Sequence, residues 1–310
     1  MQLAHSHLNG PARGARSRFC AMLVLLLSSL AAMLLMNDVA NAASGGSGSA
    51  PPVTAGSRYL ALGDSVTFGY EEPSVVPAPN YSNASSFIGY PELLASELHL
   101  KVTNAACPGE TSASMISVSA QSNGCENTPG DAHAGYRLSH PLHVRYKGSQ
   151  LAFAVRYLRS HRNVSLVSLM IGANDGLICI ETTKDGCSSS AERNAVLQAV
   201  AKNIRDILHA IRQRGHYGGQ LVIVNYFSPL TGYDAYTVEL NHAIDAAAKP
   251  FHVRVANGYG VFKVAERHSG GDPCTAELVT QLGKPGKCGI HPSYAGHALL
   301  ALAVEKAIRL

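Results

Sequence analysis

From residue 58 onward, the sequence alternates short apolar runs with longer segments whose apolar residues recur at helical spacing. The apolar runs predict strands at Tyr59–Leu62, Leu100–Asn104, Val164–Ile171, Leu221–Phe227 and His252–Ala256. The helical spacing predicts helices at Pro91–Leu98, Ser149–Ser160, Ala191–Arg214, Tyr236–Ala248 and Tyr294–Ile308. Unbroken runs of Val, Leu and Ile are typical of parallel strands that are covered on both faces. The sequence therefore predicts an α/β fold in three layers, α/β/α, with an open, doubly wound, five-stranded parallel sheet.

The first 42 residues have the features of a secretion signal. Three arginines between residues 13 and 18 precede an apolar run over residues 19–36, and Ala-Asn-Ala at residues 40–42 offers a cleavage site between small residues. We therefore expect residues 1–42 to be a cleaved signal peptide and the protein to be secreted. Because the apolar run is long for a signal peptide, a membrane anchor through residues 19–36 is the alternative.

Residues 43–57 read ASGGSGSAPPVTAGS and contain little that a core could bury. A composition so rich in Gly, Ser and Pro predicts a disordered linker. Residues 58–310 are then expected to form one catalytic or binding domain, and the strand and helix alternation runs through all of it.

After the signal peptide the chain keeps six cysteines, and these fall into three local couples: Cys107 with Cys125, Cys179 with Cys187, and Cys274 with Cys288. An even number of cysteines in an exported chain favours disulfides over free thiols. Pairing within each couple closes only short loops, so we expect this sequential pairing. A metal site is the competing interpretation, but no Cys-x-x-Cys or His-x-x-x-His spacing supports it, and we expect no metal.

The first predicted strand ends in Gly63-Asp64-Ser65, where strand, turn and helix meet. In a doubly wound sheet the ligand crevice lies at the carboxyl ends of the strands, which places Ser65 at the crevice. Capping of the next helix by Asp64 or Ser65 is the alternative explanation of this tripeptide. A nucleophilic serine would need a base, a group that orients the base, and hydrogen-bond donors for the developing oxyanion.

Candidates for these partners occur further along the chain. His291 directly precedes Pro292 and the last predicted helix, which favours it as the base, whereas His297 inside that helix is expected to be a packing or surface residue. Asn174 follows the third predicted strand and Gly109 follows the second, so both can offer an N–H to a ligand in the crevice. Turn and cap chemistry is the alternative explanation for Asn174.

The segment from Ala105 to Gly148 is too long for a simple connection and contains His133, His140 and His143. Long ordered loops at the carboxyl end of a strand usually shape a binding site. We therefore expect this segment to form one side of a substrate pocket.

Gly63-Asp64-Ser65, Gly109, Gly172-x-Asn174 and His291-Pro292 stand in the order, and at the strand ends, that the SGNH (GDSL) hydrolase superfamily shows. The chain resembles this superfamily from Arg58 to Leu310, and its cysteine couples resemble those of secreted actinobacterial-type GDSL esterases and lipases. The resemblance implies a flavodoxin-like fold and hydrolysis of carboxylic esters through an acyl-enzyme. It implies Ser65 as nucleophile and oxyanion donor, and the Gly109 amide and Asn174 side chain as the remaining donors.

The last motif departs from the superfamily pattern. The family usually has Asp-x-x-His there, but the residue three before His291 is Cys288, which has no carboxylate. We therefore expect a Ser65–His291 dyad, in which a backbone carbonyl near Cys288, held by the Cys274–Cys288 bridge, orients the imidazole. Asp272 in the same loop is the alternative acid.

The function expected from these features is that of a secreted, monomeric serine esterase or lipase that acts on a small-molecule or lipid ester without a cofactor. A carbohydrate deacetylase or phospholipase of the same superfamily is the alternative. A non-catalytic binding module would not need Ser65, Asn174 and His291, and a flavin protein would need a Ser/Thr-rich and Gly-rich loop that GDSVTFGY only partly resembles. The formal net charge is +4 without a basic cluster, so nucleic acid is not an expected partner.

Overall fold

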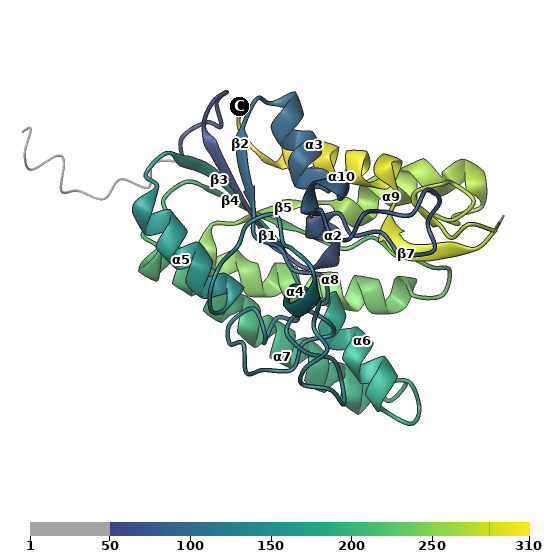
Figure 1. Ribbon diagram of the computed structural model, residues 1–310. Coiled ribbons are helices and arrows are strands. Elements are labelled where there is room, and N and C mark those ends of the chain that lie inside the picture. Colours follow the sequence, from purple (N-terminus) through teal and green to yellow (C-terminus); the bar gives the residue numbers. More distant parts are fainter. Residues whose placement is uncertain (1–49, 285) are drawn as a thin grey trace, which may run out of the picture. The chain divides into compact units, whose positions relative to one another are not determined.

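A computed structural model of the protein describes residues 50–284 and 286–310 (Figure 1). Its main sheet has five parallel strands in the order β2-β1-β3-β4-β5. The strands are β1 (Arg58–Gly63), β2 (Lys101–Asn104), β3 (Val164–Met170), β4 (Gln220–Val224) and β5 (Arg254–Ala256). Each lies within one or a few residues of its predicted position, so the predicted five-stranded parallel sheet is confirmed.

Helices cover both faces of this sheet, as Figure 1 shows. One face carries α3 (Tyr90–Glu97), α9 (Gly258–Ala265) and α10 (Tyr294–Ala307), and the other carries α5 (Gln150–Ser160), α7 (Ser190–His209) and α8 (Asp234–Ala248). The predicted three-layer α/β/α architecture is therefore confirmed. Shorter elements join these layers: α2 (Ser65–Phe68), α4 (Tyr136–Ser139), α6 (Ala173–Thr182), a π-helical turn at Ala210–Arg214, and 3-10 turns at Ala84–Ser86, Lys249–Phe251 and Glu266–Ser269.

The core lies between the sheet and the two helical layers. All seven residues of β3 are buried, which explains why its sequence, VSLVSLM, lacks the polar alternation of a half-exposed strand. Ser168 on this strand is satisfied by the hydroxyl of Tyr59 at 2.6 Å. Burial of each large aliphatic side chain here stabilises the fold by about 1.5–3 kcal/mol. This packing fixes the carboxyl edge of the sheet as a rigid base.

A second, two-stranded antiparallel sheet precedes the last helix and was not predicted. It pairs β6 (Val279–Gln281) with β7 (Cys288–Pro292). The Cys274–Cys288 bridge fixes the first residue of β7. These strands are too short to give a periodic signal, which is why the sequence does not reveal them.

Three disulfides are present among the described residues, and they follow the sequential pairing: Cys107–Cys125, Cys179–Cys187 and Cys274–Cys288. Each closes a short loop and is expected to contribute on the order of 3 kcal/mol to stability.

Within the described ranges, no helix has both the length and the apolar character needed to cross a bilayer. The expected signal peptide, residues 1–42, lies outside the described residues.

The expected linker needs correction where the structure describes it. Within residues 50–57, Val53 is only 3% exposed, and its N–H donates to the carbonyl of Arg309 at 2.7 Å. The side chain of Gln220 also donates to the carbonyl of Pro51 at 2.9 Å. These contacts pack Pro51 and Val53 against Gln220 of β4 and against Arg309 near the end of the chain. Residues 43–49 lie outside the described part.

Candidate active site

Ser65 is the first residue of α2 and is separated from the end of β1 at Gly63 by Asp64 alone. Asp64 is the helix cap, because its Oδ1 accepts a hydrogen bond from the N–H of Val66 at 3.0 Å. Capping by Asp64 leaves the hydroxyl of Ser65 free to face the cavity. The turn requires glycine at position 63, since its φ is +151° and a Cβ there would lie 2.3 Å from the carbonyl oxygen of Met170.

His291 contacts Ser65 across 226 residues of sequence. Its Nε2 lies 2.9 Å from the Oγ of Ser65. The imidazole is on β7, one residue before the turn in which Ser293 caps α10 through the N–H of Gly296 at 3.2 Å. The structure therefore brings together the serine and the histidine that the sequence singled out.

The partner of the other imidazole nitrogen is Glu72, which the sequence analysis missed. Nδ1 of His291 lies 2.8 Å from Oε1 of Glu72. The expected backbone carbonyl near Cys288 is therefore wrong, because a carboxylate occupies that position. The alternative acid is wrong as well: Asp272 is directed elsewhere and accepts from the N–H of Cys274 at 2.9 Å and from Thr275 Oγ1 at 2.8 Å.

The environment of Glu72 keeps its carboxyl group ionised. Burial acts to raise its pKa, but the hydrogen bond and the charge interaction with His291, followed by hydrogen bonds from Thr280 Oγ1 at 2.5 Å and from the N–H of Ile290 at 2.9 Å, together lower the pKa to about 2. An ionised carboxylate only accepts hydrogen bonds. Nδ1 of His291 must therefore carry the proton, which leaves the Nε2 lone pair to accept from Ser65.

Gly289 makes the approach of Glu72 possible. A Cβ at this position would lie 2.1 Å from Oε1 of Glu72 and 2.4 Å from Oγ1 of Thr280. Glu72 belongs to the loop after α2, seven residues beyond Ser65, and so comes from the start of the chain rather than from the loop of His291. The only signal in the sequence was the pair Glu71-Glu72 close to the serine, and neither strand ends nor helical spacing draw attention to it.

The two expected oxyanion donors line the same cavity as Ser65 and His291. Asn174 is the second residue of α6 and is 5% exposed; its Nδ2 donates to the carbonyl of Glu110 at 3.0 Å, and its Oδ1 accepts from Asn123 at 3.3 Å. These contacts fix the amide plane and leave its second N–H available. Gly109 has φ +80°, and a Cβ there would lie 2.4 Å from the carbonyl oxygen of Asn123. Glycine therefore allows the close contact on which this loop depends.

Two further buried carboxyl groups hold these loops in place. Oδ2 of Asp64 accepts from the hydroxyl of Tyr226 at 2.5 Å. Asp175 accepts from the N–H of Ser112 at 2.8 Å and from its Oγ at 2.6 Å, which ties α6 to the loop after β2. Burial raises the pKa of Asp64 and of Asp175 to about 6. Their contacts are structural, because neither carboxylate contacts Ser65 or His291 within hydrogen-bonding distance.

The cavity has a volume of about 400 Å³, and most of its surface is apolar. One side consists of side chains from α6, from α8 and from the segment before α8: Leu177, Ile180, Phe227, Pro229, Leu230, Tyr233, Tyr236 and Leu240. The loop over residues 105–148 supplies Pro108, Gly124 and Tyr136. The prediction that this loop forms one side of a pocket is therefore confirmed.

Groups that could hold a metal ion are few among the described residues. Two clusters have suitable spacing, one formed by Cys107, Glu110 and Cys125 and the other by Cys179, Cys187 and Glu192. The cysteines of both are joined in disulfides. A disulfide sulfur is not the thiolate that metals bind, so neither cluster has the chemistry of a metal site.

The model of the GDSL-like lipase/acylhydrolase family matches residues 61–299. The chain belongs to this family. Among solved structures, a protein from Parabacteroides merdae that is named as a GDSL-like lipase is 16% identical, with a TM-score of 0.50, and the match covers 82% of this chain and 96% of that one. Axe2, an acetylxylan esterase from Geobacillus stearothermophilus, is 14% identical, with a TM-score of 0.50 and coverage of 83% and 96%. At such low identity these likenesses show the fold alone, and no curated protein matches the sequence.

His297, His143 and His140 of this GDSL-family chain lie outside the Ser65–His291 contact. His297 is 1% exposed, neither ring nitrogen has a hydrogen-bond partner among the described residues, and burial lowers its pKa to about 3. It is therefore a neutral packing residue. Nε2 of His143 donates to the carbonyl oxygen of Phe68 at 2.9 Å. His140 packs against Tyr136, with 4.9 Å between ring centroids.

Proposed function

We propose that the protein is a secreted carboxylic ester hydrolase that forms an acyl-enzyme on Ser65. The observation that carries this proposal is the continuous chain of contacts from Ser65 through His291 to Glu72, at 2.9 and 2.8 Å. A serine hydroxyl next to an imidazole that is itself oriented by a carboxylate is the arrangement of an activated nucleophile. Family membership supports the same chemistry.

The contacts suggest a role for each group. Oγ of Ser65 attacks the ester carbonyl while Nε2 of His291 takes its proton, and the carboxylate of Glu72 stabilises the imidazolium that results. The N–H groups of Ser65 and Gly109 and the side chain of Asn174 face the oxyanion. His291 then gives its proton to the departing alcohol. Water, activated by the same imidazole, hydrolyses the acyl-enzyme and restores Ser65.

The cavity supports an ester with an apolar acyl or alcohol group. Its leucine, isoleucine and aromatic side chains, contributed by α6 and the region of α8, would exclude water from such a group. Each buried methylene contributes about 0.8 kcal/mol, so kcat/KM should rise with chain length until the cavity is full.

The three disulfides support export to an oxidising compartment.

A panel of p-nitrophenyl esters from acetate to palmitate tests this proposal, with acetylated xylan and phosphatidylcholine included to separate the deacetylase and phospholipase alternatives. We expect p-nitrophenyl esters longer than acetate to be the best substrates, and Ser65→Ala to remove nearly all activity while circular dichroism shows an intact fold. Failure of the wild-type protein to hydrolyse any of these esters, or retained activity in Ser65→Ala, would contradict the proposal.

A further inference from the structure

Gln150 makes three hydrogen bonds to two segments that carry the site, the end of β1 and the loop after β2, although it belongs to neither of them. It is the first residue of α5 and is fully buried. Its Oε1 accepts from the N–H of Gly63 at 2.7 Å, and its Nε2 donates to the carbonyl of Gly63 at 2.9 Å and to Oε2 of Glu110 at 3.0 Å. Both hydrogens of the amide are therefore in use, and its position is fully determined.

The two residues that Gln150 joins adjoin the reacting groups. Gly63 precedes Asp64 and Ser65, so the amide of Gln150 holds the turn that presents the nucleophile. Glu110 follows Gly109, and its backbone carbonyl accepts from the side chain of Asn174 at 3.0 Å. Ser149 caps α5 through the N–H of Ala152 at 3.2 Å, which fixes the backbone from which Gln150 extends. One buried side chain thus links the nucleophile turn to both remaining oxyanion donors.

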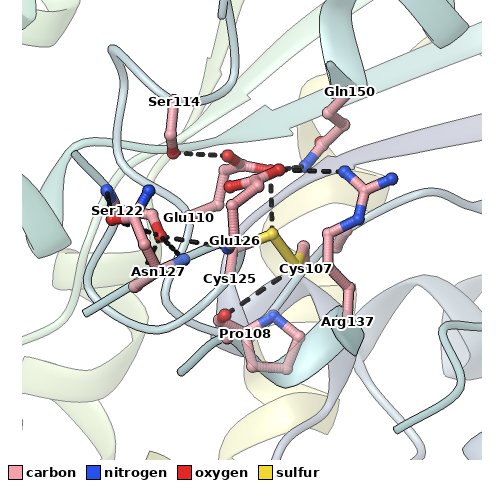
Figure 2. Close-up of a disulfide and its surroundings, with 12 residues drawn as sticks. Cys107, Pro108, Glu110, Ser114, Ser122, Cys125, Glu126, Asn127, Arg137 and Gln150 are labelled. Carbon is pink, nitrogen blue, oxygen red and sulfur yellow. Dashed lines mark hydrogen bonds and ion pairs between the residues drawn. A yellow bond between two sulfur atoms is a disulfide. The ribbon is translucent and has the colours of Figure 1, made fainter. Parts of the chain in front are cut away.

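The carboxyl group of Glu110 lies in a buried pair of acids, shown in Figure 2. Glu110 is fully buried, and its Oε1 accepts from Ser114 Oγ at 2.5 Å. The carboxyl group of Glu126 lies beside it; Arg137 contacts Oε1 of Glu126 at 2.9 Å, but Oε2 is buried without a hydrogen-bond partner among the described residues. One guanidinium for two buried carboxyl groups leaves one negative charge to be neutralised.

A proton on Glu110 resolves this imbalance. Burial, and then the neighbouring Glu126, raises the pKa of Glu110 to about 8, while Arg137 acts in the opposite direction. The hydroxyl of Tyr146 also interacts with Glu110, and burial raises the pKa of this hydroxyl. Glu110 is therefore a neutral acid at pH 7, and its proton can satisfy the acceptor that Glu126 leaves unpaired.

We propose that Gln150 and the neutral carboxyl group of Glu110 are positioning residues, which hold the Ser65 turn and the Gly109 and Asn174 donors in one catalytic arrangement. Neither side chain lines the cavity, so both act through the backbone and not on the substrate. The inference rests on the proposed ester hydrolysis.

Substitution of Gln150 tests the link directly. Gln150→Leu removes all three hydrogen bonds, and Gln150→Glu keeps the acceptor but loses both donors. Because a shift of about 1 Å in reacting groups can cost about 100-fold, we expect kcat to fall by about 10-fold to 100-fold in both variants, with KM nearly unchanged. A rise in KM with kcat unchanged would overturn the proposal.

The chain offers a matched control in Gln220. This buried glutamine also makes three hydrogen bonds to backbone, to the carbonyl of Pro51 at 2.9 Å and to the carbonyl and N–H of Arg309, both at 2.8 Å. It begins β4 and so lies at the opposite edge of the sheet from Ser65. Gln220→Leu should lower the melting temperature without changing kcat at temperatures where it is folded. If Gln150→Leu and Gln220→Leu lose kcat equally, Gln150 has only a structural role.

Glu110 is tested by its neutral isostere. Glu110→Gln should keep kcat within about threefold of the wild type at pH 7, whereas Glu110→Leu, which loses the contacts to Gln150 and Ser114, should lose at least 10-fold. The kcat of the wild type should fall as pH rises through about 8, and that of Glu110→Gln should not. Equal losses in Glu110→Gln and Glu110→Leu, or identical alkaline profiles in Glu110→Gln and the wild type, would contradict the inference.

Stability gives a readout that does not depend on activity. The folded pKa of Glu110, about 8, exceeds the value of about 4.3 expected in the unfolded chain, so the native state binds the extra proton between these values. The contribution of Glu110 to stability is therefore complete below about pH 4.3 and is lost as pH rises through about 8. Glu110→Gln should lack this loss. The melting temperature of the variant should therefore rise relative to that of the wild type as pH increases from 5 to 9.

These measurements separate the two proposals. A wild-type protein without esterase activity would overturn the proposed function and, with it, the positioning roles. An active wild type with unimpaired Gln150→Leu and Gln150→Glu variants would overturn the positioning roles alone. An active wild type whose Gln150 variants lose kcat, while Gln220→Leu does not, supports both.

Discussion

The two halves of the candidate active site are held by different kinds of structure. Ser65, Gly109 and Asn174 follow strands of the buried parallel sheet and are braced by Gln150, Asp64 and Asp175. His291 and Glu72 lie instead on a two-stranded hairpin and on a loop, and they are joined by hydrogen bonds and anchored by one disulfide. The first half depends on the core, whereas the second depends on a few polar contacts near the surface. Substitutions of the polar groups in the second half should therefore reduce activity with little effect on the fold.

The largest effect is expected for Glu72→Gln. This change keeps the shape of the side chain but removes the charge that selects the tautomer of His291 and stabilises its imidazolium. Loss of the corresponding charge in a serine protease costs about 10,000-fold in kcat, and we expect a decrease of that order. Asp272→Asn is the control and should retain most activity, because among the described residues the Asp272 side chain accepts hydrogen bonds only from Cys274 and Thr275. If steady-state kinetics instead show that Asp272→Asn loses activity and Glu72→Gln keeps it, Asp272 and not Glu72 is the acid that orients His291.

On the sheet side, Asn174→Ala should have a smaller effect. Removal of one oxyanion donor typically costs about 100-fold to 1,000-fold in kcat, or roughly 2.7–4 kcal/mol. This variant also loses the hydrogen bond to the carbonyl of Glu110, so its melting temperature should fall slightly. The kcat and KM of Asn174→Ala with the best ester of the panel test this role. If KM rises while kcat is unchanged, Asn174 is a substrate contact and not an oxyanion donor.

Loss of the Cys274–Cys288 bridge should reduce kcat by up to about 100-fold, because β7 then no longer holds His291 in position. The matched control replaces Cys179 and Cys187 by serine, which removes a disulfide whose cysteines lie outside β7. Each double variant should lose on the order of 3 kcal/mol of stability. If the two double variants show the same kcat under conditions in which both are folded, the hairpin does not depend on its disulfide.

The smallest expected effect concerns stability in acid. The folded pKa of Glu72, about 2, lies below the value of about 4.3 for an unfolded glutamate. The carboxylate therefore contributes stability that is present above about pH 4.3 and is lost as pH falls through about 2. The difference in melting temperature between the wild type and Glu72→Gln should shrink over this range. A constant difference would show that Glu72 is not held as a carboxylate in the folded protein.

The sequence pointed to the half of the site that depends on the sheet and, in the other half, to His291 but not to Glu72. Apolar runs mark the strands, parallel strands direct their carboxyl ends to one edge, and Ser65 and Asn174 stand at two such ends. Glu72 could not be found this way, because it lies in an irregular loop and meets His291 only after β7 forms. Proximity in sequence to Cys288 favours Asp272, whereas Gly289 accommodates the carboxylate of Glu72, more than 200 residues earlier in the chain.

Two further features were beyond sequence reasoning for the same reason. The packing of Val53 depends on where the end of the chain passes, since its N–H pairs with the carbonyl of Arg309. The three hydrogen bonds of Gln150 depend on the meeting of α5, β1 and the loop after β2. In both cases the partner is remote in sequence, and the residue type alone gives no indication of it.

The most direct test of the account is the rate and position of fluorophosphonate labelling in the wild type, Glu72→Gln and Asp272→Asn. The reagent reports nucleophile activation without requiring the natural substrate. The account predicts that peptide mapping finds the label on Ser65 alone, and that labelling is orders of magnitude slower in Glu72→Gln but unchanged in Asp272→Asn. Labelling of another serine, or a rate in Glu72→Gln equal to that of the wild type, would contradict the chain of contacts from Ser65 through His291 to Glu72 as the basis of catalysis.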